Sequence, residues 1–160
     1  MLEFQLDPSH LKGSPTERLR IALQQANDLI CQEFISNQMY VGMGTTFTAA
    51  AIFGRELYLA LVGDSRAYLI RNNQIQSGGY GNSLIASLVR AGHISAIEAE
   101  HFASRSNSFQ ALGIGTSFQV EMVQMELRIE DVIVLCTDGL SGKVTMREIE
   151  KIVVGSTQES

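Results

Sequence analysis

The amino-acid sequence predicts an α+β domain in which helices flank a layer of antiparallel strands. A long segment near the N-terminus has the three- and four-residue apolar spacing of a helix. Several short segments rich in β-branched and aromatic residues follow, and tight turns separate them. A second group of such segments precedes a final helical segment. Runs of strands with helices at their flanks are typical of a layered α+β fold.

The chain is long enough to form one domain with a sizeable core. It has 160 residues, of which 45% are hydrophobic and 18% are charged, and such a composition suits a globular domain. Residues 1–13 show no clear period, so we expect an arm or loop there. The domain is expected over 14–155, with a polar tail over 156–160.

The first helix is predicted from about residue 15 to residue 35. Ser14 is a suitable N-cap, Pro15 suits the first helical position, and Glu17 completes a capping box. The apolar stripe that follows consists of Leu19, Ala22, Leu23, Ala26, Leu29, Ile30 and Phe34.

The strands that follow are predicted as an antiparallel meander. Residues 45–53 and 56–62 are strand-like and are joined by the tight turn Gly54-Arg55. A third strand, 67–71, passes through the Asn72-Asn73 turn into 74–76.

The middle of the chain combines a flexible loop with two short helices. Residues 78–82 are rich in glycine. Residues 83–90 have helical spacing, and Gly92 is expected to end that helix. Ser95 to Glu98 repeats the capping-box pattern and is expected to open a helix that reaches about residue 103.

Two further strands and a helix complete the predicted elements. Residues 118–127 alternate imperfectly between apolar and polar, as expected of a strand with one buried face. Residues 131–137 contain a continuous apolar run, which predicts a strand covered on both faces or central in its sheet. Thr145 to Glu148 is expected to cap a short helix that ends before Gly155.

Charge and cysteine content exclude several classes of function. The net charge of -5 disfavours a surface that binds nucleic acid or an anionic membrane. Cys31 and Cys136 have neither disulfide nor zinc-site spacing and are expected to be small buried hydrophobes. The N-terminus lacks the pattern of a signal peptide, and no apolar run is long enough to cross a bilayer. We therefore expect a cytoplasmic protein with no membrane contact.

Two aspartates follow predicted strands. Asp64 ends the strand 56–62 as part of Gly63-Asp64, and Asp138 follows the apolar run as part of Asp138-Gly139. Carboxylates at adjacent strand ends are a common way to hold Mg²⁺ or Mn²⁺. Taken alone, however, each pair is explained more simply by a turn, because Asp bonds the backbone amides that follow it and Gly supplies a positive φ.

Other side chains give weaker signals for chemistry. The three histidines, His10, His93 and His101, have no metal-binding spacing. Ser65 and Ser141 have no recognisable His-Asp partner, so a nucleophilic role is not expected for either.

Several motifs in order resemble those of bacterial metal-dependent serine/threonine phosphatases of type 2C. Gly42-Met43-Gly44-Thr45-Thr46 resembles the G-T-T stretch of that family, and the residues around Val62-Gly63-Asp64-Ser65-Arg66-Ala67-Tyr68 resemble its V-G-D-S-R-A-Y stretch. Residues 83–94 resemble its helix after an Asp-His-Ser motif. Gln110 to Gly113 resembles its Arg-Ala-Leu-Gly, and Leu135 to Gly142 resembles its Asp-Gly-Leu turn. The resemblance covers roughly residues 15–152.

The resemblance implies a sandwich of two antiparallel sheets flanked by helices, with two Mg²⁺ or Mn²⁺ ions at one end. In that chemistry a metal-bridging water attacks phosphorus. This chain is similar to a truncated, degenerate member, because the family's N-terminal strands and last strand have no counterpart in it. Gly81-Asn82-Ser83 stands in place of Asp-His-Ser, and Gln110 in place of the arginine. Among the family's ligand positions only Asp138, next to Gly139, keeps its acid, while Asp64, Ser65 and Arg66 keep a structural motif.

Three hypotheses for function follow from the resemblance. The first is a domain without phosphatase activity that binds a phosphoprotein or a regulatory protein. The second is an active Mg²⁺- or Mn²⁺-dependent serine/threonine phosphatase, completed by another chain or by Asp7, Glu3 or Asp131. The third is a remnant with no selected role, which would be only marginally stable as a monomer. Because missing strands would expose sheet edges, we also expect a homo-oligomer formed through them.

Overall fold

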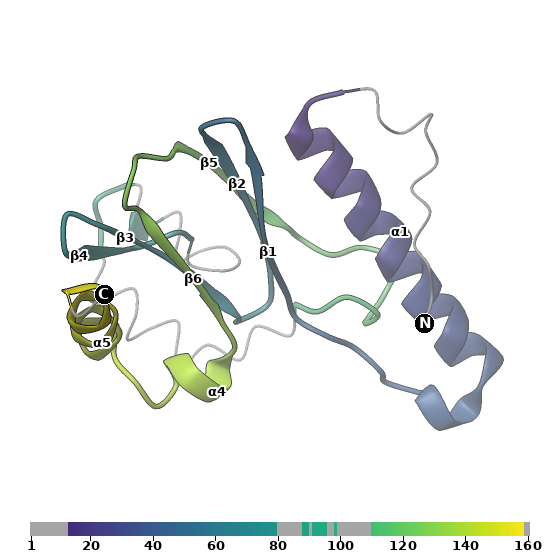
Figure 1. Cartoon of the computed structure of the whole chain (residues 1–160). Helices are drawn as coiled ribbons and strands as arrows, with labels where there is room; N and C mark the ends of the chain where they lie inside the picture. The colour runs from purple at the N-terminus through teal and green to yellow at the C-terminus, as the bar shows by residue number, and fades with distance from the viewer. Residues whose placement is uncertain (1–12, 80–87, 90, 96–97, 99–109, 159–160) are drawn as a thin grey trace.

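The computed structural model describes residues 13–79, 88–89, 91–95, 98 and 110–158, and the fold is shown in Figure 1. A long helix near the N-terminus and a helix at the C-terminus enclose six strands. In chain order the elements are α1 (Pro15–Ser36), η2 (Gln38–Tyr40), β1 (Phe47–Phe53), β2 (Glu56–Val62), β3 (Arg66–Arg71), β4 (Gln74–Ser77), β5 (Glu121–Glu126), β6 (Val132–Cys136), α4 (Asp138–Ser141) and α5 (Met146–Gln158).

The helix start predicted at Ser14 is confirmed. The Ser14 hydroxyl accepts a hydrogen bond from the Glu17 backbone N–H at 3.3 Å, and the Glu17 carboxylate accepts one from the Ser14 N–H at 2.7 Å. This reciprocal pair satisfies two backbone donors that a helix start would otherwise leave unpaired. Helix α1 then continues to Ser36, close to the predicted end.

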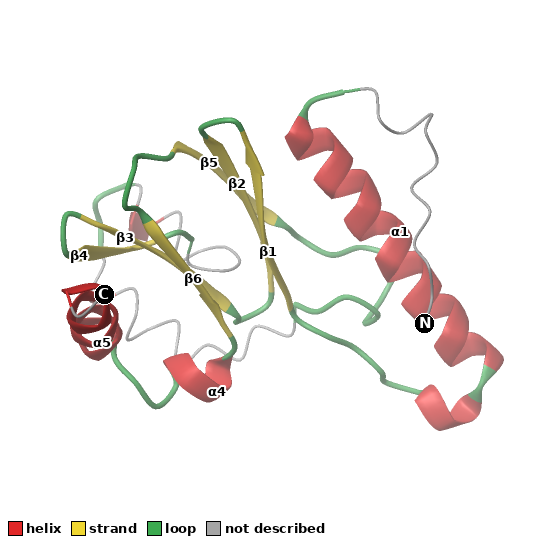
Figure 2. Ribbon diagram, in the orientation of Figure 1, coloured by secondary structure: helices red, strands yellow, loops and turns green. Residues whose placement is uncertain are grey.

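The strands of the described residues form two antiparallel sheets of three strands each. Figure 2 shows these strands in yellow between the red helices. The first sheet has the order β1-β2-β5, and the second sheet has the order β4-β3-β6. The predicted hairpins between β1 and β2 and between β3 and β4 are present, with Phe53 opposite Glu56 and Arg71 opposite Gln74. The predicted fold class of two antiparallel sheets flanked by helices is thereby confirmed.

The predicted meander is wrong at the step from β2 to β3. These strands do not pair, because the chain crosses from the first sheet to the second between Val62 and Arg66. Each of the two strands is central in its sheet, where both faces are covered, so each carries a nearly continuous run of buried residues. Such a run of buried residues is typical of a central strand but does not show which strands lie beside it.

Strand β6 is also placed differently from the prediction. The apolar run predicts a central or doubly covered strand, yet in the described part of the chain β6 pairs only with β3 and forms an edge of the second sheet. Its Leu135 is 43% exposed. The preceding strand, β5, begins at Glu121, three residues later than predicted.

The core forms two clusters on opposite faces of β2. Leu23 of α1 packs with Ala60, Val62 and Leu112 on one face. Leu57, Leu59 and Leu61, on the other face, pack with Ala67 of β3 between the two sheets. Alternate residues of one strand therefore serve alternate layers, as strand geometry requires.

The second sheet is covered by α5. This helix lies beside β4 (Figure 1), and its Ile149 is buried. The layers are therefore α1, the first sheet, the second sheet and α5. Helix α5 runs to Gln158, so it extends past Gly155 and includes residues 156–158, where the sequence predicts a polar tail.

Two further helix ends agree with the sequence prediction: the start of α5, and the end of the helical segment before Gly92. Thr145 and Glu148 form the capping box, with the Thr145 N–H donating to the Glu148 carboxylate at 2.8 Å. Gly92 has a φ of 73° and donates to the Val89 carbonyl, as expected of a glycine that ends a helix. Most of the helices predicted over 83–90 and 95–103 lies outside the described residues.

No helix among the described residues combines the length and the apolar character needed to cross a membrane.

Candidate functional site

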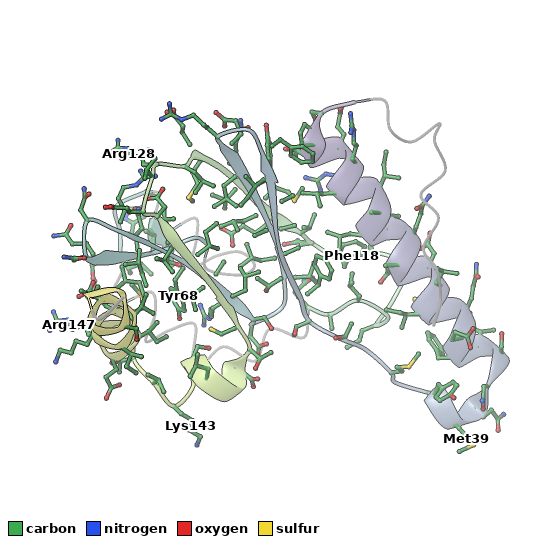
Figure 3. All side chains as sticks on the ribbon, viewed as in Figure 1. Met39, Tyr68, Phe118, Arg128, Lys143 and Arg147 are labelled. Atoms are coloured by element: carbon green, nitrogen blue, oxygen red, sulfur yellow. The ribbon has the colours of Figure 1, made fainter. Side chains whose placement is uncertain are left out.

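Sequence motifs that lie far apart in the chain meet at one end of the sandwich. Phe47 at the start of β1 lies opposite Val62 at the end of β2, and Arg66 at the start of β3 lies opposite Cys136 at the end of β6. We call this end, formed by Thr46, Gly63–Arg66 and Thr137–Gly139, the motif end. In Figure 3, Lys143, which follows α4, lies far from Arg128, which marks the opposite end of the sandwich.

Gly63 allows the chain to cross between the sheets at the motif end. Its φ of 90° is one that L side chains rarely adopt. A Cβ atom at this position would lie 2.5 Å from the Thr46 methyl carbon and 2.9 Å from the Gln110 carbonyl oxygen. Both the turn and the close packing therefore require glycine, which gives a physical reason for the Gly63-Asp64-Ser65-Arg66 motif.

A buried pair of hydroxyl groups links the two motif loops. Thr46 Oγ1 and Ser65 Oγ lie 2.8 Å apart and share a hydrogen bond. Ser65 is only 4% exposed. The hydroxyl of Ser65 therefore connects the residue before β1 to the crossing segment.

The segment Gln110 to Gly113 packs beside the same loops. Thr45 and Leu112 exchange two backbone hydrogen bonds of 3.0 and 2.9 Å, which form an isolated bridge before β1. A Cβ atom on Gly113 would lie 2.7 Å from the Met43 carbonyl oxygen. The segments around Gly44, Gly63 and Gly113 thus contact one another, because each contains a glycine at a point of close approach.

Asn27 is a structural residue that the sequence analysis missed. It is completely buried, its Oδ1 accepts a hydrogen bond from the Gly113 N–H, and its Nδ2 donates to the Gly115 carbonyl, both at 2.9 Å. These bonds hold the 113–115 turn against α1. One feature of the sequence could have revealed this role: Asn27 lies four positions after Leu23 and three before Ile30, so it falls on the apolar face of the helix.

The three residues of the predicted structural motif differ in exposure. Asp64 is exposed at the motif end, whereas Ser65 and Arg66 are buried. Arg66 lies opposite Cys136. Burial raises the pKa of the Cys136 thiol, and the positive charge of Arg66 partly opposes that rise. The thiol is therefore held in its protonated form at neutral pH, as expected of an inert cysteine.

Asp138 lies just beyond β6. It is the first residue of the short helix α4, with Thr137 as the N-cap. Both Asp138 and its neighbour Gly139 are exposed to solvent. The carboxylate is thus accessible at the motif end, where the resemblance implies a metal ligand.

The described residues do not fit a centre for two divalent metal ions. Among them, no group of three or more His, Cys, Asp or Glu side chains is placed to hold a metal. Such a centre needs several carboxylates, because Mg²⁺ and Mn²⁺ take most of their ligands from oxygen atoms. Asp7, Glu3 and Gly81-Asn82-Ser83 lie outside the described residues.

Asp131, one of the alternative acids, is at the opposite end of the second sheet from Asp138. Its two carboxylate oxygens accept hydrogen bonds from Arg71 Nε at 2.8 Å and Arg71 Nη2 at 2.6 Å. The Arg128 backbone N–H donates to the same carboxylate at 2.7 Å. Hydrogen bonding to Arg71 lowers the pKa of Asp131, although burial opposes that effect. Asp131 is therefore engaged in an ion pair and is too remote to complete the motif end.

Comparisons with known sequences point to one family. Residues 3–81 match the family model described as Protein phosphatase 2C. Serine/threonine phosphatase stp of Listeria welshimeri is 33% identical over 135 residues, which cover 84% of this chain and 54% of that protein. Serine/threonine protein phosphatase PstP of Mycobacterium tuberculosis is 31% identical over 156 residues, which cover 97% of this chain and 30% of that protein.

Solved structures give the same result for the fold. Serine/threonine phosphatase Stp1 from Staphylococcus aureus matches with a TM-score of 0.74 and 28% identity, covering 95% of this chain and 58% of that one. The Mycobacterium tuberculosis phosphatase PstP/Ppp matches with a TM-score of 0.72 and 30% identity, covering 91% of this chain and 61% of that one. The chain spans about half the length of the Listeria relative and less of PstP.

Proposed function

We propose that this chain, which belongs to the type 2C protein phosphatase family, is a binding or regulatory module without phosphatase activity of its own. Its serine/threonine phosphatase-type domain keeps the loops of the motif end. The proposed partner is a phosphoprotein or a regulatory protein, and the proposed location is the cytoplasm.

One observation carries this proposal. The motif end presents the exposed carboxylates of Asp64 and Asp138, yet the described residues contain no group of three metal-binding side chains. A single acid with water ligands would bind Mn²⁺ weakly, because affinity for hard cations depends on the number of charged oxygen ligands. Without firmly bound metal, the loops keep the shape of the family's site but lack the means to activate water.

A second function is favoured by the accessibility of Asp138. Its carboxylate is exposed, and the loops around it are packed through the Thr46–Ser65 and Thr45–Leu112 contacts. Acids from another chain could therefore complete a site at the motif end. This alternative is an active Mg²⁺- or Mn²⁺-dependent serine/threonine phosphatase. Where the other chain is a second copy of this one, an assay of the purified chain distinguishes it from the first proposal.

Hydrolysis of p-nitrophenyl phosphate tests the proposal. We expect the purified chain with millimolar Mn²⁺ to hydrolyse this substrate no faster than its Asp138→Asn variant. The matched control is Asp64→Asn, which removes the other exposed carboxylate of the motif end. Mn²⁺-dependent hydrolysis that Asp138→Asn abolishes and Asp64→Asn does not would reject the proposal and support the active enzyme.

A further inference from the structure

The two sheets end in strands that differ sharply in how their edges are protected. In the described part of the chain the edges are β1 and β5 in the first sheet and β4 and β6 in the second. An edge strand leaves a row of backbone donors and acceptors without strand partners. Proteins usually protect such edges with charged side chains, prolines, bulges or covering elements.

Strands β4 and β5 show this protection. The Ile75 N–H of β4 donates to the Glu150 carboxylate of α5 at 2.6 Å, so a side chain of the covering helix satisfies an edge amide. Strand β5 begins and ends with glutamates, and the second of these, Glu126, is exposed and lies 3.1 Å from Arg55. Both edges therefore discourage pairing with another strand.

Among the described residues, strands β1 and β6 have no such protection along their outer edges. Their sequences, Phe-Thr-Ala-Ala-Ala-Ile-Phe and Val-Ile-Val-Leu-Cys, contain no charged residue and no proline. At the end of β1, Ile52 is 54% exposed and Phe53 is 51% exposed. A long, uncharged, apolar edge is a template for strand pairing.

The two unprotected edges lie on the same side of the sandwich. Strands β1 and β6 contact each other across the gap between the sheets. Ile52 lies opposite the core residue Leu57, and Leu135 lies opposite the core residue Ala67, so both face the space between the sheets. Both are nevertheless about half exposed. In the part of the chain that the structure describes, these two side chains at the margin of the core are therefore only partly covered.

We propose that β1 pairs antiparallel with β1 of a second copy of this chain. Backbone donors along an edge are matched by another strand, and an uncharged partner strand can pair with β1 without placing a charge beside its apolar side chains. The same seven residues provide such a strand across a two-fold axis. Ala49, Ala50 and Ala51 at the centre of β1 permit close approach of the two strands.

The distribution of charge also favours contact between two copies at the β1 edge. The chain carries a net charge of -5, so two copies repel one another over most of their surface. The β1 edge contributes nothing to that repulsion. Contact between copies is thus less costly at the β1 edge, where Ile52 and Phe53 are about half exposed, than at charged parts of the surface.

Sedimentation velocity over a range of concentrations tests the proposal. We expect the wild-type chain to sediment as a dimer that dissociates on dilution. Ala51→Lys places a charge on the edge opposite Tyr58, and we expect it to weaken the dimer by about tenfold or more. Gln76→Lys adds the same charge to the protected edge strand β4 and should leave the dimer unchanged.

Hydrogen exchange on the wild-type chain supplies a readout that needs no variant. Amides of β1 should exchange more slowly as concentration rises, while those of β4 should not change. A monomer at all concentrations would overturn the proposal. A dimer whose protection lies outside β1, or one that a folded Ala51→Lys variant leaves intact, would overturn it as well.

Discussion

At the scale of single residues, buried polar side chains hold the motif end and the neighbouring 113–115 turn in place. Asn27 and Ser65 are both almost fully buried, and each has hydrogen-bond partners in the loops it contacts. Buried polar groups with partners define a single arrangement of the loops, because any other arrangement leaves them unpaired. Thr48 Oγ1, in contrast, is buried with no hydrogen-bond partner among the described residues.

The contrast between two threonines gives a first prediction. Thr48→Val removes the unpaired hydroxyl without changing the side-chain shape, so the free energy of unfolding should rise by about 1 kcal/mol. Thr46→Val removes the partner of the buried Ser65 hydroxyl and should lower it by about 1 to 2 kcal/mol. Urea denaturation of both variants measures the difference. A Thr48→Val variant less stable than wild type would mean that this hydroxyl has a partner.

The ion pair between Asp131 and Arg71 gives a prediction about pH. The pKa of Asp131 is lowered in the folded protein, chiefly by its hydrogen bonds to Arg71. The unfolded chain therefore takes up this proton at a higher pH than the folded chain. The stability from this group is complete above an ordinary carboxyl pKa of about 3.9 and is lost as pH falls toward the lower, folded value.

We therefore expect Asp131→Asn to be less stable than wild type at pH 7 and to lose less stability between pH 5 and pH 3. The control is Glu130→Gln, which removes the same charge from an exposed neighbour and should leave the acid dependence close to that of wild type. Thermal unfolding at several pH values measures both. Identical acid dependence in wild type and Asp131→Asn would contradict the assignment.

At the scale of elements, a short segment sets the relation between the two sheets. Three residues, Gly63 to Ser65, separate β2 from β3, and the chain changes sheet within them. Gly63 has a positive φ and packs tightly against Thr46 and Gln110. The crossing, and with it the motif end, depends on this glycine.

Two alanine substitutions separate backbone strain from packing. Gly63→Ala should lower the free energy of unfolding by about 3 kcal/mol, because it adds a strained φ and a close contact with Thr46 and the Gln110 carbonyl. Gly54 also has a positive φ, of 62°, but has open space around it. Gly54→Ala should therefore cost about 1 kcal/mol. Equal costs in urea denaturation would show that packing at Gly63 is unimportant.

Local signals in the sequence predicted the individual elements well but not their neighbours. The capping residues Ser14 and Thr145 mark the helix starts, and the Gly54-Arg55 turn marks the first hairpin, because each is a local interaction. The change of sheet after Val62 and the edge position of β6 depend on which strands pair. Pairing is decided by contacts between distant residues, and an apolar run such as 132–136 does not report them.

At the scale of the whole molecule, family membership and chemical competence are separate properties. The resemblance predicted the sandwich, and the glycines at 63 and 113 explain why the family's motifs adjoin one another. It also implies a metal ligand at Asp138, which stays a prediction; the structure shows that this residue is exposed at the motif end. The buried Asn27 was missed, because a single polar residue within an apolar stripe gives no indication of its partner in the turn at 113–115.

Isothermal titration of the purified chain with Mn²⁺ tests the central claim most directly, because it counts metal ions whether or not hydrolysis occurs. We predict no pair of tightly bound ions per chain, and at most weak binding that Asp138→Asn removes. The titration should give this result at chain concentrations below and above any dimer transition. Two Mn²⁺ ions bound tightly per chain, with both sites weakened by Asp138→Asn, would contradict the account.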